Sequence, residues 1–253
     1  MRRNGRRCGR TTLETEAAID NTRMRLADRD PLAGSSWSDA RTVEGFVHSS
    51  PNPSLMAAAA QAFQSSARLL DIGCGAGRNA VPLARTGWRV VGADLSSAML
   101  TAAASRVKAE ALSNRVELVL APMDALPFAS STFDFIVAHG IWNLARSGHQ
   151  FRNAARQASR VARPGALLFL FTFSRHTLPV GAEPVSGESF VYTQFSGQPQ
   201  CFLTEEQVGT ELATAGFTRH PSHPLRELNR PRDGVRTIGG PVIYEGIFRC
   251  GDG

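Results

Sequence analysis

The stretch from residue 69 to residue 79 limits the possible folds of this chain more than any other feature. An apolar run over residues 67–72 predicts a short buried strand of a parallel sheet, although Asp71 interrupts it near its end. Three glycines follow at alternate positions, and a helical pattern then opens at Arg78 and ends at Gly87. A strand, a glycine turn and a helix in this order predict the first unit of a doubly wound α/β sheet.

The glycine turn predicts a site where a ligand approaches the backbone. Gly73, Gly75 and Gly77 leave the N–H groups of the turn open, because glycine has no side chain to hold a ligand away. The next predicted strand, residues 88–93, leads directly into Asp94. An acid roughly 20 residues beyond such a turn can accept hydrogen bonds from both hydroxyls of a bound ribose.

The spacing of the turn argues against a dinucleotide ligand. In the G-x-G-x-x-G fingerprint the third glycine would occupy position 78, where this chain has Arg78. Here an acid, Asp71, stands just before the first glycine of the turn. A carboxylate at that place would repel a pyrophosphate, whereas it would attract an ammonium or sulfonium group.

Residues 69–79 resemble motif I of the class I S-adenosylmethionine-dependent methyltransferases. The resemblance covers roughly residues 68–173, with a weaker similarity to the C-terminus. It implies that Asp71 anchors the methionine end of S-adenosyl-L-methionine, directly or through water, and that Asp94 holds the ribose. It also implies that Asp124 accepts a hydrogen bond from the adenine amine, although an aspartate beside prolines is often only a turn former. The residues assigned to cofactor binding by this resemblance are Asp71, Gly73, Cys74, Gly75, Asn79, Asp94, Leu95, Met99, Met123, Asp124, Ala125 and His139.

The whole chain predicts an α/β fold, a doubly wound and mostly parallel seven-stranded sheet with helices on both faces and an antiparallel last strand. We expect residues 1–35 to form a basic tail and N-terminal segment, and residues 36–253 to form a single methyltransferase domain. Residues 174–201 are rich in Gly, Pro, Ser, Thr and Gln, and they predict a substrate cap with a short strand at 189–195. The remaining predicted strands cover residues 116–121, 133–138, 166–173, 217 onward and 241–248.

Capping residues and apolar periodicity predict the helices. The predicted helices cover residues 54–63, a segment that begins at Ser96 or Ser97, an apolar stripe over 151–161, and a segment from 203 to 216. Residues 12–24 could form a further helix. Phe46 and His48 either belong to a lid over the methionine end, as in many members of the resembled family, or pack across the edge of the sheet.

Residues that follow the fourth and fifth predicted strands are candidates for the acceptor side, because ligands bind outside the carboxyl ends of parallel strands. His139 could act as a general base, since imidazole titrates near neutral pH, or it could meet the cofactor through its backbone. Trp142 and Asn143 could shape the acceptor pocket, with a core position as the alternative for Trp142. Arg175 and His176 could meet an anionic acceptor.

The charge pattern gives little support for a nucleic-acid partner. Most of the formal net charge of +6 comes from arginines among the first ten residues, so the rest of the chain is close to neutral. These arginines precede no apolar segment, and the apolar stretch at 165–171 is too short to span a bilayer. We therefore expect a cytoplasmic protein without membrane contact. The four cysteines form no C-x-x-C pair, no motif suggests a metal, and the oligomeric state stays open.

The function indicated by the resemblance is transfer of a methyl group from S-adenosyl-L-methionine to a small molecule, with secondary metabolites and thiols among the acceptors. Two alternatives stay open. An RNA methyltransferase could use the arginine-rich tail as an electrostatic anchor. A non-catalytic regulator could bind S-adenosylmethionine while its acceptor pocket is closed.

Overall fold

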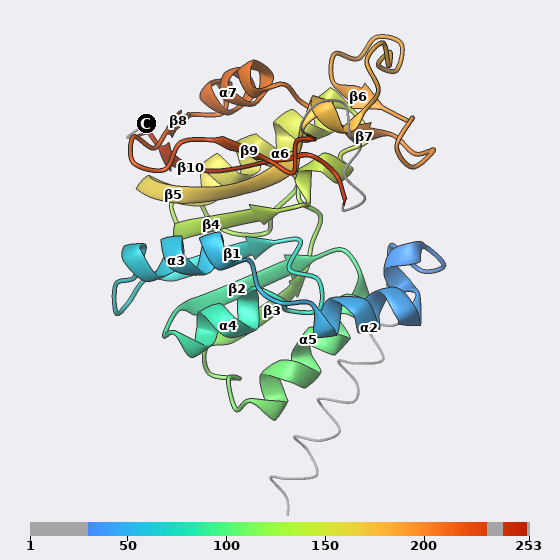
Figure 1. The fold of residues 1–253 in the computed structure, drawn as a ribbon. Coiled ribbons are helices and arrows are strands. Elements are labelled where there is room, and N and C mark those ends of the chain that lie inside the picture. The colour runs from blue at the N-terminus through green and yellow to red at the C-terminus, as the bar shows by residue number, and fades with distance from the viewer. Residues whose placement is uncertain (1–29, 232–239, 252–253) are drawn as a thin grey trace, which may run out of the picture.

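A mixed sheet forms the centre of the molecule. The computed structural model describes residues 30–231 and 240–251. Within these residues, eight strands form one sheet in the order β3-β2-β1-β4-β5-β10-β8, and β9 pairs with β10 (Figure 1). The strands are β1 (Arg68–Ile72), β2 (Arg89–Asp94), β3 (Val116–Leu120), β4 (Phe133–His139), β5 (Ala162–Phe173), β8 (Phe217–Arg219), β9 (Arg226–Leu228) and β10 (Ile243–Cys250).

The strands β3, β2, β1, β4 and β5 are parallel, whereas β10 runs antiparallel to β5. This arrangement confirms the predicted doubly wound α/β fold with an antiparallel last strand. The carboxyl ends of the parallel strands share one side of the sheet, which we call the carboxyl edge. Because Ile243 is in register with Phe173, the amino end of β10 lies at this same edge.

The prediction of seven strands was one too few. The outer edge of β10 pairs with two separate strands, β8 beside Phe248–Cys250 and β9 beside Ile243–Glu245. The short segment between β8 and β9 contains Pro221 and Pro224, which have no backbone N–H to donate to a ladder. One predicted strand is therefore divided into two short strands.

Helices cover both faces of the sheet, and each face has its own apolar core. One core combines β1 and β4 with α3 (Pro53–Ala62), α4 (Ala80–Arg85) and α5 (Ser97–Ala109). The other combines β4 and β5 with α6 (Gly148–Val161) and α7 (Glu205–Thr214). In Figure 1, α3 and α4 lie on the near side of the sheet.

The helix ends follow from capping groups in the sequence. The hydroxyl of Ser96 accepts from the backbone N–H of Met99 at the start of α5. Thr204 and Gln207 form a reciprocal capping box at the start of α7, which confirms the helix predicted there. Each such cap satisfies N–H groups that have no partner inside the helix.

The cap and the N-terminal segment lie at the carboxyl edge. In the cap, β6 (Val191–Tyr192) and β7 (Gln200–Cys201) form a separate two-stranded sheet, so the strand expected at 189–195 is shorter than predicted. Before β1, the chain forms η1 (Ser36–Ser38) and α2 (Ala40–His48), and α2 contacts α5. Figure 1 shows α2 and the cap on the same side of the sheet.

Part of the predicted organisation falls outside the described residues. The arginine-rich tail and the possible helix at 12–24 belong to this part, so the division of the chain at residue 35 stays a prediction. In the portion of the chain that the structure describes, no helix combines the length and apolar character needed to cross a membrane.

Candidate cofactor and acceptor site

The turn between β1 and α4 has the open backbone that its glycines predict. Gly73, Gly75 and Gly77 have φ angles of +72°, +53° and +76°, in the left-handed region that favours glycine. A Cβ atom on Gly73 would lie 2.6 Å from the side chain of Ile141, so no side chain fits at this position. The N–H groups of Gly73 and Cys74 donate to the carbonyl of Ala93, which holds the turn beside β2.

Asp71 places a buried carboxylate beneath this turn. Its side chain is 1% exposed, and its Oδ2 atom has no hydrogen-bond partner among the described residues. Burial raises the pKa of Asp71 to about 7, and the Asp94 carboxylate adds to this rise, while the charge of Arg78 opposes it. A buried carboxylate oxygen without a partner is a position where a cationic ligand group gains most.

Asp94 keeps hydrogen-bonding capacity at the end of β2. Its Oδ2 accepts from the backbone N–H of Gly75 at 2.8 Å, and its Oδ1 accepts from that of Ser96 at 2.9 Å. Each carboxylate oxygen has two lone pairs, so the carboxylate keeps capacity for further hydrogen bonding beyond these backbone contacts. Burial raises the pKa of Asp94 above its ordinary value, against these backbone hydrogen bonds.

These groups fit S-adenosylmethionine. The unpaired Oδ2 of Asp71 suits a cationic methionine end, and the free lone pairs of Asp94 suit the two ribose hydroxyls. The side chain of Met99 is buried close to Gly75. Cys74 is a buried free thiol packed under Gly92. The cofactor roles of all these residues stay predictions.

The other predicted cofactor residues lie around the same turn or on the next loop. The side-chain oxygen of Asn79 accepts from the backbone N–H of Asn52, so this residue holds the N-terminal segment against the turn. Leu95 follows β2 and is half-buried. In the loop after β3, Met123 and Asp124 are half-buried, whereas Ala125 is exposed.

The N-terminal segment covers the glycine turn. A Cβ atom on Gly75 would lie 3.3 Å from the ring of Phe46, and this ring packs edge-on against Trp37. The hydroxyl of Ser96 donates to the carbonyl of Trp37. His48 is exposed instead and pairs with Glu44 within α2. The lid interpretation is thus supported for Phe46 and not for His48.

His139 lies in a half-buried polar cluster that we call the His139 cluster, made of Asn52, Arg78, His139 and Glu245. The Nη2 of Arg78 donates to Nδ1 of His139 at 2.7 Å, and Nδ2 of Asn52 lies 3.2 Å from Nε2. The same Asn52 nitrogen donates to Oε2 of Glu245 at 2.7 Å. The imidazole also stacks on Phe171, with ring centroids 4.2 Å apart.

This environment disfavours the predicted base role of His139. Burial, with the nearby charge of Arg78, lowers the pKa of His139 to about 3. Because a guanidinium only donates, Nδ1 accepts and its lone pair is engaged. A ring in this state is a poor acceptor for a substrate proton near neutral pH. The alternative, a contact between His139 and the cofactor, stays a prediction.

Trp142 and Asn143, predicted to shape the acceptor pocket, are both buried. Trp142 is 0% exposed and packs edge-on against Phe151 of α6, which places it in the core. The Oδ1 atom of Asn143 is buried and lacks a hydrogen-bond partner in the described ranges. Asn143 therefore keeps an unsatisfied acceptor near Gly140.

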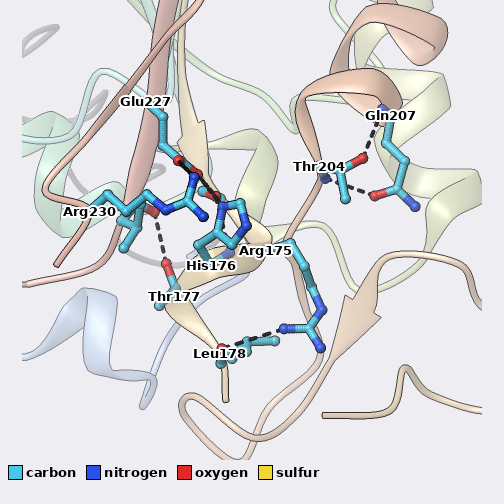
Figure 2. Close-up of polar contacts among 10 residues, drawn as sticks. Arg175, His176, Thr177, Leu178, Thr204, Gln207, Glu227 and Arg230 are labelled. Carbon is cyan, nitrogen blue, oxygen red and sulfur yellow. Dashed lines mark hydrogen bonds and ion pairs between the residues drawn. The ribbon is translucent and has the colours of Figure 1, made fainter. Parts of the chain in front are cut away.

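Arg175 and His176 follow β5 and turn in different directions (Figure 2). The Arg175 guanidinium donates to the cap, at the carbonyl of Ala182 (2.8 Å) and the hydroxyl of Tyr192 (3.1 Å). Its hydrogen bonds thus hold the cap, which leaves it less suited to an anionic acceptor. His176 turns toward Glu227, and Nδ1 and Oε1 are 2.6 Å apart.

The sequence reasoning missed several residues of this region. Arg78 was not predicted to be a site residue, and neither were Asn52, Glu227 and Glu245. Glu245 had a usable signal, because it is a charged residue in the middle of a mostly apolar strand. Asn52 and Glu227 lie in polar surroundings and carry no such signal.

The comparisons with known proteins agree with this fold. A family model described as a methyltransferase domain matches residues 69–165. A demethylmenaquinone methyltransferase of Corynebacterium urealyticum is 34% identical over 166 residues, 59% of this chain and 67% of the relative. Methyltransferase GfsG of Streptomyces halstedii is 39% identical over 104 residues, 40% of this chain and 36% of the relative. The chain thus spans between about a third and two thirds of the length of these relatives.

Solved structures show the same fold. A 1,6-didemethyltoxoflavin N1-methyltransferase of Burkholderia thailandensis has a TM-score of 0.60 and 19% identity, over 98% of this chain and 94% of that one. The cyclase SpnF has a TM-score of 0.62 and 20% identity, over 93% of this chain and 96% of that one. This protein belongs to the class I S-adenosylmethionine-dependent methyltransferases, and S-adenosyl-L-methionine is the cofactor of that family.

Proposed function

We propose that this protein transfers a methyl group from S-adenosylmethionine to a small organic molecule. The observation that carries the proposal is the pair of acids beside the glycine turn. Asp71 offers an unpaired, buried carboxylate oxygen, and Asp94 keeps capacity for further hydrogen bonding. The two acids suit opposite ends of one ligand that has a cationic group and a ribose.

The names of similar proteins support a small acceptor. The relatives include demethylmenaquinone methyltransferases and ubiquinone/menaquinone C-methyltransferases, and one structural neighbour is a didemethyltoxoflavin methyltransferase. The presence of a cyclase among the structural neighbours means that the fold alone does not establish methyl transfer. The proposal therefore depends on the donor-side acids rather than on the fold.

The residues of this chain would act mainly by positioning. The bound sulfonium supplies a methyl group that is already activated for attack. Asp71 would hold the cationic end through charge, and Asp94 would hold the ribose, so that the methyl faces the carboxyl ends of β4 and β5. Alignment of this kind can lower a barrier by about 7–11 kcal/mol in the best intramolecular cases.

A labelling experiment tests the proposal. The protein would be incubated with methyl-labelled S-adenosylmethionine and, separately, with the low-molecular-weight fraction and the RNA fraction of a cell extract. We expect label in a small product, and less label when Asp94→Ala is used at a donor concentration that just saturates the wild type. Label in RNA would favour the RNA methyltransferase instead. Donor binding by calorimetry without any labelled product would favour a non-catalytic regulator.

A further inference from the structure

We propose that His176, oriented by Glu227, is the general base that removes a proton from the acceptor, and that the acceptor is a phenol or enol hydroxyl. This inference rests on the proposed methyl transfer. The residues that carry it are Ser174, His176, Glu227 and Arg230, which we call the His176 cluster. They lie at the end of β5 and in β9 with the residues just after it.

The position of His176 suits an acceptor. His139, the last residue of β4, is in register with Phe171 of β5. His176 belongs to η3 (Arg175–Thr177), just after β5 ends at Phe173. At about 3.3 Å per residue, the end of β5 extends roughly 7 Å farther along the strand direction than His139 does, and η3 follows it. An acceptor bound over the methyl group would occupy this space.

The orientation of the imidazole is set by Glu227. Nδ1 of His176 lies 2.6 Å from Oε1 of Glu227 (Figure 2). The buried hydroxyl of Ser174 donates to the same oxygen. Nη1 of Arg230 lies 3.2 Å from Oε2 of Glu227. Since a carboxylate only accepts, Nδ1 carries the proton, and in the neutral ring Nε2 keeps its lone pair.

Glu227 is held in its charged form. Burial alone would raise its pKa, but the hydrogen bonds from Ser174 and His176 outweigh burial and lower the pKa of Glu227 below its ordinary value. The Glu227 side chain is 15% exposed and the His176 side chain 46% exposed. The carboxylate is thus sheltered, while the imidazole has an accessible side. A base needs this combination of a fixed tautomer and an open nitrogen.

Within residues 30–231 and 240–251, few charged or titratable groups surround this imidazole. Glu227 of β9 contacts it directly, Arg230 contacts Glu227, and Tyr244 of β10 lies next to Ser174 and Glu227. Burial raises the pKa of Tyr244, so this phenol stays neutral. Arg175 adjoins His176 in the chain, but its guanidinium contacts the cap. Arg230 is engaged by Glu227, which offsets its effect on the imidazole.

The need for a base identifies the acceptor class. A neutral amine attacks through its own lone pair, and a thiol ionises close to neutral pH, whereas a phenol with a pKa near 10 benefits from a base. The surroundings also suit a flat apolar ring. Phe195 of the cap is partly exposed and packs against Phe173, the last residue of β5, with ring centroids 5.5 Å apart.

The step balances as follows. The acceptor hydroxyl gives its proton to Nε2 of His176 while its oxygen forms a bond to the transferred methyl carbon. The carbon–sulfur bond breaks, and the sulfur keeps the electron pair. The Glu227 carboxylate stabilises the positive charge on the imidazole until the proton passes to water.

The test uses the labelled donor and the low-molecular-weight extract fraction, with the wild type, His176→Gln and Glu227→Gln. Gln at position 176 can still donate to Glu227, but it has no titratable nitrogen. We expect His176→Gln to lower kcat by about 10²–10⁴-fold and to remove the decline of kcat toward acid pH. Glu227→Gln should lower kcat less and shift that decline. Donor affinity should not change in either variant.

Two controls separate this role from a structural one. His149→Gln, in an exposed residue of α6, should behave like the wild type. Added imidazole should restore turnover to His176→Ala, which a merely structural role would not allow. Wild-type kcat in folded His176→Gln would overturn the base assignment while leaving methyl transfer intact. A product methylated on sulfur or nitrogen would overturn the acceptor class. No labelled product from the wild type would contradict the proposed function itself.

Discussion

The two halves of the carboxyl edge are built in different ways. At the ends of β1 and β2, Asp71 and Asp94 are close in sequence to the glycine turn and keep unused hydrogen-bonding capacity. At the ends of β4 and β5, His139 and His176 instead contact groups that are distant in the chain, Arg78 and Asn52 for His139 and Glu227 for His176. Asn52 and Glu245 are separated by 193 positions. The residues proposed to bind the methyl donor, which is common to the whole family, lie close to one sequence motif. The residues on the acceptor side are brought together by tertiary contacts.

The two histidines at this edge make the same point in detail. His139 meets a donor, Arg78, which occupies the lone pair of Nδ1, whereas His176 meets an acceptor, Glu227, which leaves the lone pair on Nε2. Both rings lie close to a glutamate and to an arginine. Burial together with the donor or acceptor character of the nearest partner therefore distinguishes the two rings.

The largest effect should be a loss of affinity for S-adenosylmethionine when Asp94, at the end of β2, is replaced. Asp94→Ala removes charge-assisted hydrogen bonds to the ribose worth roughly 1.5–3 kcal/mol in total. The dissociation constant for S-adenosylmethionine should rise by about 10- to 150-fold, measured by calorimetry. The exposed Glu206 of α7 offers a matched control, since Glu206→Ala should not change affinity. If folded Asp94→Ala binds S-adenosylmethionine as tightly as the wild type, Asp94 does not hold the ribose. The contrast between the ends of β1 and β2 and the ends of β4 and β5 would then be lost.

The next effect concerns Asp71 and pH. The carboxylate form is the one that attracts a cation, and the pKa of Asp71 is about 7 in the free protein. Donor affinity should therefore fall by up to about tenfold per unit as the pH drops below 7. Asp71→Asn should bind the donor weakly at every pH between 5 and 8, without this dependence. A wild-type affinity that is flat over this range would contradict the role of Asp71.

The same residue links donor binding to stability. Because the pKa of Asp71 is raised in the folded state from 3.8 to about 7, its contribution to stability is complete below about pH 3.8 and is lost as the pH rises through 7. Without ligand, Asp71→Asn should be more stable than the wild type at pH 8 by about 1–4 kcal/mol, and the difference should shrink toward pH 4. Denaturant unfolding at both pH values measures this difference.

A smaller effect should separate burial from charge at His139. Arg78→Met removes the donor to Nδ1 and the nearby charge, but the ring stays buried against Phe171. The pKa of His139 should rise from about 3 by roughly one unit and remain below 6.5, because burial is the larger cause. Titration of labelled histidine by NMR gives this value. If the pKa of His139 does not rise in Arg78→Met, burial alone accounts for its low value. The contrast between the partners of His139 and His176 would then be weaker.

The smallest effect should follow removal of residues 1–10, which lie outside the described residues. All of the contacts reported above for the predicted cofactor and acceptor residues lie within residues 30–231 and 240–251. Deletion should leave the melting temperature and donor affinity unchanged. A deletion that abolishes both turnover and RNA binding would favour the RNA methyltransferase.

The sequence by itself determined the local parts of this protein. Apolar runs, capping residues and glycines predict strands, helices and the turn, because backbone geometry and burial pattern depend on near neighbours in the chain. The α/β class, the parallel strands and the capped α7 all follow from such patterns, whereas the antiparallel last strand was implied by the resemblance to the methyltransferase family. The positions of Asp71 and Asp94 follow in the same way, since each comes at the end of a strand.

The tertiary structure alone decided which side chains meet and what protonation state results. No local pattern indicates that Asn52 reaches Glu245, that Arg78 donates to His139, or that Glu227 holds His176. The chemistry of an imidazole depends on its burial and on the charge within a few ångströms, and the fold brings those groups from distant elements. For this reason His139, the natural candidate for a base from sequence, has a pKa of about 3. His176 has the partner that a base needs.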